Sequence, residues 1–211
     1  MAVLDHETGR GLARHSDGSS DQPLLVTPAI RPSAREQLAT LERLGLSAQD
    51  GVTEADLLAD REVAQAIRRH PYLALLHCLA RDADGELTHH PHVTTVDLEH
   101  VVGPDSYPDL VRKLAAAGST GELGEVHGGV DRERNRWVVR FRVGQITREL
   151  HPRLDHDYAD MAVLPWIFDA VCLPGQASAF VRHGQRITVA YVPRWHVDEL
   201  QRVLDRWAFT A

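Results

Sequence analysis

Histidines and acids concentrate in the segment LTHHPHVTTVDLEH, residues 87–100. His90 and His92 are two residues apart, so on a strand their imidazoles would share one face, as at the start of many zinc sites. Together with His100 they form the candidate ligand set for zinc or another transition metal. Pro91 fits an edge or a loop better than a central strand. We therefore expect solvent-exposed histidines, and no cofactor is predicted.

A second cluster of ionisable residues lies in HPRLDHDYAD, residues 151–160. A carboxylate beside an imidazole can orient a general base, so His156, Asp157 and Asp155 are the candidate catalytic residues of a His/Asp-dependent enzyme. The structural alternative is that Asp157 caps the following helix and Asp160 complements its dipole, because helix starts favour acids. Whether this cluster meets the histidine-rich segment in one cleft depends on the fold.

Three arginines alternate with aromatic and aliphatic residues in the segment RWVVRFRV. On a strand Arg136, Arg140 and Arg142 share one face, whereas Trp137 and Phe141 lie on the other. Stacking of nucleic-acid bases needs aromatic and basic side chains on one surface, and the net charge of the chain is −7. Nucleic acid is therefore not an expected partner. The arginine row would suit an acidic patch on another protein as well as it would suit nucleic acid.

Sequence motifs of several common enzyme classes are absent. The chain has no P-loop, no dinucleotide-binding glycine motif, no HExxH, no GxSxG and no paired CxxC. Cys78 and Cys172 lie in apolar segments and are expected to be buried, reduced thiols. These observations favour a non-enzymatic protein without excluding an enzyme whose site uses scattered residues.

The composition is that of an ordinary globular protein, with 211 residues of which 43% are hydrophobic and 25% charged. No apolar run is long enough to span a bilayer, and the N-terminal segment lacks the apolar core of a signal peptide. We expect a cytoplasmic protein with no membrane partner. Residues 1–32 are rich in Gly, Ser, Asp and Pro, which predicts a flexible or docked tail.

Residues 33–70 predict a pair of helices. Ser33 and Glu36 have the spacing of a capping box before a helix with leucines at helical spacing. A second helix is predicted to start after Thr53 and to end before Pro71. Residues 72–80 are apolar at both even and odd positions, so either a buried strand or a short helix fits them.

Residues 71–211 predict an α+β domain that forms one folded unit with the helical pair, over residues 33–211. The strand predicted at 93–102 places Val96, Leu98 and Val102 on the core face, with Asp97 and Glu99 on the open face. The further predicted elements are a helix at 103–118, a β-meander at 123–150, a helix led by Asp157 in which Pro165 causes a kink or starts a second piece, a hairpin at 178–192 and a helix at 194–207. Runs of strands between helices predict an antiparallel sheet, built of the meander and hairpins and covered on one face by helices.

The meander has a predicted register because Gly144-Gln145 has the composition of a two-residue type II′ hairpin turn. The predicted opposite pairs are Val143 with Ile146, Arg142 with Thr147, Phe141 with Arg148, and Arg140 with Glu149. This register places Arg148 on the apolar face, so we expect it at the rim of the sheet or paired with an acid.

Residues 93–170 contain a series of short motifs: Asp97 and Glu99 at the end of a strand, Asp105 and Tyr107 opening a helix, Trp137, Val139 and Phe141 on one strand, and Asp157 and Asp160 before a helix. In this series the chain resembles an uncharacterised, mainly actinobacterial group of α+β proteins. The group carries no activity to transfer. Some of its members lie near toxin genes, so the resemblance implies an immunity or partner-binding role.

The sequence therefore predicts a protein-binding module of the immunity or partner-neutralising type, with another protein as its partner. The acids among the candidate residues would suit a basic partner. The candidate binding residues are Asp97, Glu99, Asp155, Asp157, Asp160, Arg136, Arg140 and Arg142. Two alternatives stay open: a metal- or His/Asp-dependent hydrolase or small-molecule tailoring enzyme, and an adaptor subunit of a larger complex. The oligomeric state does not follow from the sequence.

Overall fold

The computed structural model describes residues 30–99, 101–118, 122–154 and 157–208. The chain divides into two units, Met1–Ile30 and Arg31–Ala211. The predicted tail lies almost wholly outside the described residues. Among the helices that are described, none is both long and apolar enough to cross a membrane.

Four short helices begin the second unit: α1 Ala34–Arg43, α2 Glu54–Ala59, α3 Arg61–Arg69 and α4 Leu73–Leu76. The predicted capping box of Ser33 and Glu36 is present, since each side chain accepts a hydrogen bond from the other residue's backbone N–H. The second predicted helix is divided at Asp60, whose carboxylate accepts the N–H groups of Glu62 and Val63 and so starts α3. The ambiguous stretch 72–80 forms α4 and the first residue of a strand.

The strands form three antiparallel sheets. A two-stranded sheet pairs β1 Ala80–Arg81 with β2 Leu87–Thr88. The central sheet has the order β3 Val93–Asp97, β8 Arg186–Pro193, β7 Gln176–His183. The meander has the order β4 Leu123–Asp131, β5 Arg136–Val143, β6 Ile146–Leu150. The predicted α+β class with antiparallel sheets is confirmed.

The meander has the predicted register. Val143 lies opposite Ile146, and Phe141 lies opposite Arg148. Trp137 and Phe141 are buried on the inner face, as expected from their positions on β5. Arg148 is exposed on β6, at the edge of the sheet.

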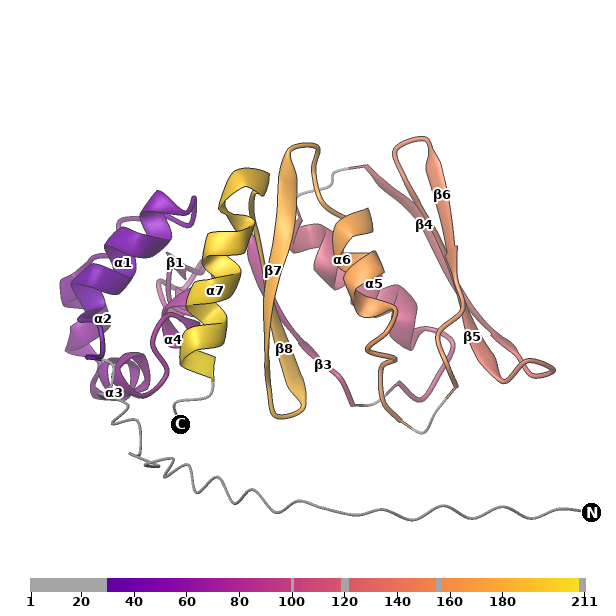
Figure 1. The fold of residues 1–211 in the computed structure, drawn as a ribbon, viewed down its shortest axis with the longest axis horizontal. Coiled ribbons are helices and arrows are strands. Elements are labelled where there is room, and N and C mark those ends of the chain that lie inside the picture. Colours follow the sequence, from indigo (N-terminus) through magenta and orange to yellow (C-terminus); the bar gives the residue numbers. More distant parts are fainter. Residues whose placement is uncertain (1–29, 100, 119–121, 155–156, 209–211) are drawn as a thin grey trace, which may run out of the picture. The chain divides into compact units, whose positions relative to one another are not determined.

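The central sheet packs against apolar cores on both of its faces, which differs from the single covered face expected from the sequence. Ile187 and Tyr191 of β8 belong to one core, and Ala190 and Val192 of the same strand belong to the other. Helices α5 Ser106–Ala117 and α6 Leu164–Ala170 lie between this sheet and the meander, whereas α7 Val197–Ala208 and the N-terminal helices lie on the opposite side (Figure 1). The central strand β8 is therefore buried along nearly its whole length.

Two predicted boundaries were wrong. The strand predicted at 93–102 ends at Asp97, so Val102 is 70% exposed and Val101 takes the core position instead. The helix expected to start at Asp157 starts at Leu164, because Pro165 occupies its first turn, where the missing N–H costs nothing. Asp157 is therefore not a helix cap.

Candidate functional site

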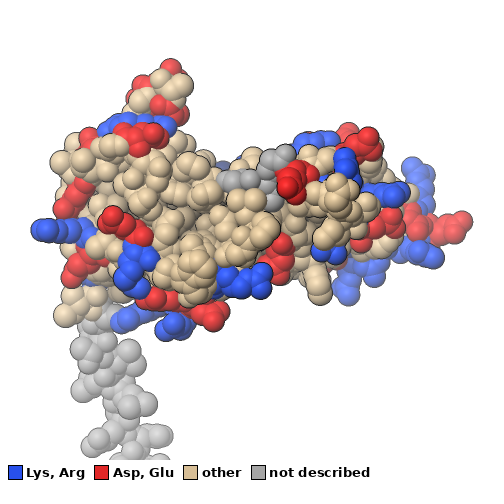
Figure 2. Space-filling view, turned by 90° about the horizontal axis from the view of Figure 1, so that it is seen from above, with Lys and Arg blue, Asp and Glu red and all other residues tan. Residues whose placement is uncertain are grey.

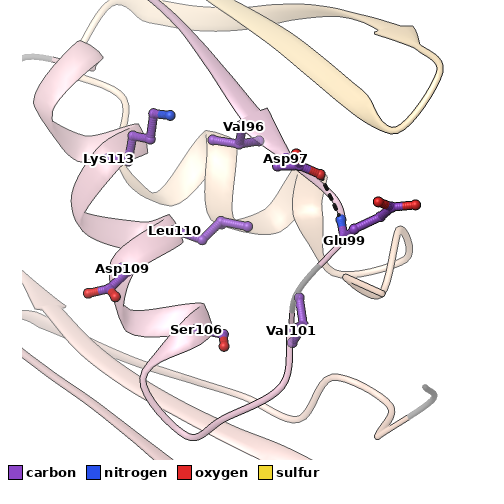
Figure 3. Close-up of a pocket in the computed structure, with 8 residues that line it drawn as sticks. All are labelled: Val96, Asp97, Glu99, Val101, Ser106, Asp109, Leu110 and Lys113. Atoms are coloured by element: carbon purple, nitrogen blue, oxygen red, sulfur yellow. Dashed lines mark hydrogen bonds between the residues drawn. The ribbon is translucent and has the colours of Figure 1, made fainter. Parts of the chain in front are cut away.

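A pocket of about 270 Å³ lies beside the end of strand β3, between this strand and helix α5. Figure 3 shows Leu110 and Ser106 projecting from α5 toward the segment that contains Val96 and Val101, with the Asp97 and Glu99 carboxylates at the end of the strand. The pocket therefore has an apolar floor and an acidic rim.

The two carboxylates of this rim retain unused acceptor capacity. Asp97 Oδ1 accepts the backbone N–H of Glu99 at 3.0 Å, and Glu99 Oε1 accepts the Tyr158 hydroxyl at 3.1 Å. The hydrogen bond to Glu99 raises the pKa of Tyr158, since it stabilises the protonated phenol. In the described part of the chain neither Asp97 nor Glu99 forms an ion pair.

Two further charged residues line the pocket from α5. The Asp109 carboxylate pairs with the guanidinium of Arg112 at 2.7 Å, and in Figure 3 it points away from β3. Lys113 is the one cation among the eight lining residues. A single ammonium group against the carboxylates of Asp97 and Glu99 leaves the rim with a negative balance.

The second predicted cluster meets this region in part. The Ala159 N–H donates to the carbonyl of Leu98 at 2.8 Å, and the Val101 N–H donates to the carbonyl of Asp157 at 3.0 Å. Asp157 and Ala159 therefore lie beside Val101 and Leu98, and Tyr158 reaches Glu99. Asp155 and His156 lie outside the described residues, so the structure does not place the predicted imidazole–carboxylate pair.

Asp160 has a structural role. Its two carboxylate oxygens accept the backbone N–H groups of Arg153 and Ala162, both at 2.9 Å. Its own N–H donates to the Tyr107 hydroxyl at 2.7 Å. These bonds fix the path of the chain before α6.

A group of histidines gathers on the opposite face of the central sheet. The ring centroids of His77 and His89 are 5.4 Å apart, and those of His77 and His183 are 6.3 Å apart. The Nε2 atoms of His183 and His77 lie 2.9 and 3.3 Å from the hydroxyl of Thr188, which is 1% exposed. A third partner of this hydroxyl is Thr95 Oγ1, at 2.8 Å on the neighbouring strand.

The surroundings of this histidine group favour neutral imidazoles. Burial lowers the pKa of His77 to about 4, and the nearby His89, His183 and Arg186 add to the effect. Burial also lowers the pKa values of His89 and His183, to which Lys113 and Arg186 contribute respectively. The Thr188 hydroxyl is too deeply buried to meet a substrate, so it does not support nucleophilic catalysis.

The histidines chosen from the sequence lie elsewhere. His90 is 4% exposed rather than solvent-exposed, its Nδ1 accepts the N–H of His92 at 3.0 Å, and burial lowers its pKa to about 4. His92 Nδ1 lies 3.2 Å from the carbonyl of Ala117. His100 lies outside the described residues. Within the described ranges no set of three or more His, Cys, Asp or Glu side chains is arranged to hold a metal ion.

The arginine row lies on the outer face of the meander, as predicted, and thus on a different sheet from Asp97. Arg140 is flanked by His127 on β4 and by Glu149 on β6. Figure 2 shows basic and acidic side chains intermingled at this end of the molecule. The candidate binding residues therefore form separate surfaces, and in the row of Arg136, Arg140 and Arg142 one acid, Glu149, lies opposite Arg140.

A cleft between β6 and α6 was not foreseen. It has a volume of about 640 Å³, and its lining includes Ile146, Arg148, Asp169 and Arg194. A smaller cavity beside it shares Arg148 and Asp169 and is bordered by Trp166, which is 70% exposed. The larger cleft is lined by both acidic and basic residues, namely Glu122, Arg148, Asp169 and Arg194, so its charge does not favour one class of ligand.

No family model, curated protein or solved structure matches this chain. The functional argument therefore rests on geometry and charge. Sequence reasoning identified Asp97 and Glu99 from strand periodicity, but it did not find Leu110 and Lys113 on the opposite wall. Their positions on a helix gave no signal that this helix borders the strand.

Proposed function

We propose that the protein is a protein-binding module of the partner-neutralising type, whose site is the acidic pocket beside β3. The observation that carries this proposal is the position of Asp97 and Glu99, two carboxylates without an ion pair among the described residues, above an apolar pocket floor. The partner is a basic protein.

The site suits a basic segment. An apolar side chain of that segment would pack against Val96 and Leu110, while the cationic group of an arginine or lysine beside it would reach the carboxylates of Asp97 and Glu99. Opposite charges across an interface accelerate association and discourage wrong partners. Rapid, specific capture is what neutralisation of a toxic partner requires.

The test is a comparison of two double variants that change the net charge equally. D97K/E99K reverses the rim of the pocket, whereas D84K/E133K reverses two exposed acids outside it. Affinity capture from the native lysate should recover a stoichiometric basic protein with the wild type and with D84K/E133K, but not with D97K/E99K. Equal recovery by both variants, or no stoichiometric protein with the wild type, would contradict the proposed function.

A further inference from the structure

Strand β3 is an edge strand of the central sheet, because the strand order is β3-β8-β7. The Leu98 N–H donates to the carbonyl of Gln185 at 2.8 Å, and the Tyr191 N–H donates to the carbonyl of His92 at 2.9 Å. In an antiparallel pair, backbone groups alternate between pointing toward the neighbouring strand and away from it. The even-numbered residues of β3 therefore bond to β8, and the odd-numbered residues point their backbone groups outward.

The outward backbone groups belong to Thr95 and Asp97. In the part of the chain that the structure describes, no hydrogen bond engages the N–H or C=O group of either residue. An edge with free donors and acceptors is a template for an additional strand. The pocket of the proposed site lies along this same edge, since Val96 and Asp97 form one of its walls.

We propose that β3 accepts an extended, basic segment of the partner protein as a fourth, antiparallel strand. This inference rests on the proposed function. The backbone of that segment would bond to Thr95 and Asp97, and helix α5 would form the second wall of the groove. Strand addition of this kind draws affinity from main-chain hydrogen bonds and specificity from pockets for alternate side chains.

The register of the added strand sets its sequence pattern. A residue opposite Asp97 lies on the same face as that carboxylate, so a cationic side chain is favoured there. A residue opposite Val96 points to the other face, where Leu110 forms the apolar floor. The preferred segment therefore alternates basic and apolar residues.

The length of the added strand is limited at the start of β3. His92 Nδ1 lies 3.2 Å from the carbonyl of Ala117, so the C-terminal end of α5 meets the strand there. From Thr95 onward the pocket-lining residues follow this edge as far as Glu99, two residues past the end of the strand. A segment of about five residues fills this stretch, at about 3.3 Å per residue.

The test uses fluorescein-labelled Arg-Val-Arg-Val-Arg and two N-methylated versions, titrated by fluorescence anisotropy against the full chain. In the antiparallel register the arginine N–H groups point toward β3 and the valine N–H groups point to solvent. Methylation of the arginine nitrogens should weaken binding at least about tenfold, whereas methylation of the valine nitrogens should leave it nearly unchanged. Each methylated peptide carries two N-methyl groups, one version on the central and C-terminal arginines and the other on both valines. The two therefore have the same composition, so each controls for the other.

Equal affinities of the two methylated peptides, or no binding of the unmodified peptide up to about 1 mM, would overturn strand addition. Other outcomes of the same titrations would contradict the proposed function independently of strand addition. If Glu-Val-Glu-Val-Glu binds as tightly as the basic peptide, or if D97K/E99K does not weaken the basic peptide, the acidic rim does not select the partner. Selection of the basic peptide with no effect of methylation would retain the proposed function and remove the added strand.

Discussion

His77 and His90 should make the folded protein sensitive to mild acid. Burial lowers the pKa of each imidazole to about 4 in the folded state, whereas an unfolded histidine has a pKa near 6.5. Below pH 6.5 the unfolded chain binds protons that the folded chain does not. The stabilisation from the neutral imidazoles is therefore fully present above pH 6.5 and is lost as the pH falls toward 4.

The size of the effect follows from the difference between the two pKa values. Between pH 7 and pH 5 a histidine with these values loses about 2 kcal/mol of unfolding free energy. His90 is 4% exposed, so the full figure applies to it. His77 is only half-buried, and solvent screening reduces its share to about 1 kcal/mol. The pair should therefore cost about 3 kcal/mol, a large part of the stability of a domain.

The assay is urea unfolding of the wild type and of the variant H77Q/H90N at pH 7 and pH 5. Glutamine carries an amide nitrogen near the position of His77 Nε2, and asparagine carries an oxygen that can accept the His92 N–H. The variant retains polar partners at both sites but cannot titrate. Most of the pH-dependent loss should disappear in the variant. The same loss in both proteins would refute the assignment to these histidines.

Two further experiments test local features of the fold. Thr188→Val keeps the side-chain shape but removes a buried hydroxyl with three side-chain partners, so urea unfolding should show a loss of about 1 to 3 kcal/mol; a change below about 0.5 kcal/mol would contradict that network. Gly45→Ala should lower the melting temperature more than Gly51→Ala. Both glycines have positive φ, but a Cβ at Gly45 would lie 2.9 Å from Pro193 Cδ, whereas a Cβ at Gly51 meets nothing within 4 Å; equal losses would mean that the Pro193 contact relaxes.

Local signals predicted the meander with its register. A two-residue turn fixes which residues face each other, and the alternation of apolar and polar residues then fixes which face is buried. Val143 and Ile146 are paired as the turn at Gly144 requires. Even so, Ile146 is 54% exposed, and it lines the cleft between β6 and α6.

The two-sided central sheet was less accessible to prediction. The segment RITVAYV is apolar at odd and even positions alike, which is typical of a strand buried on both faces. A hairpin pattern alone does not reveal the layer that covers each face. The histidine group depends on contacts of the same kind, since Thr188 and His77 are 111 residues apart in the chain. Periodicity carries no information about such pairs.

The acidic rim of β3 has a second physical consequence that bears on the proposed role. An exposed edge strand invites pairing with another copy of itself, and charged residues at the edge are a common protection against it. Pairing of two β3 edges would bring both sets of Asp97 and Glu99 carboxylates into one interface, where like charges repel. A basic strand meets no such repulsion. The same two side chains would therefore disfavour self-association and, under the proposed function, favour a basic partner.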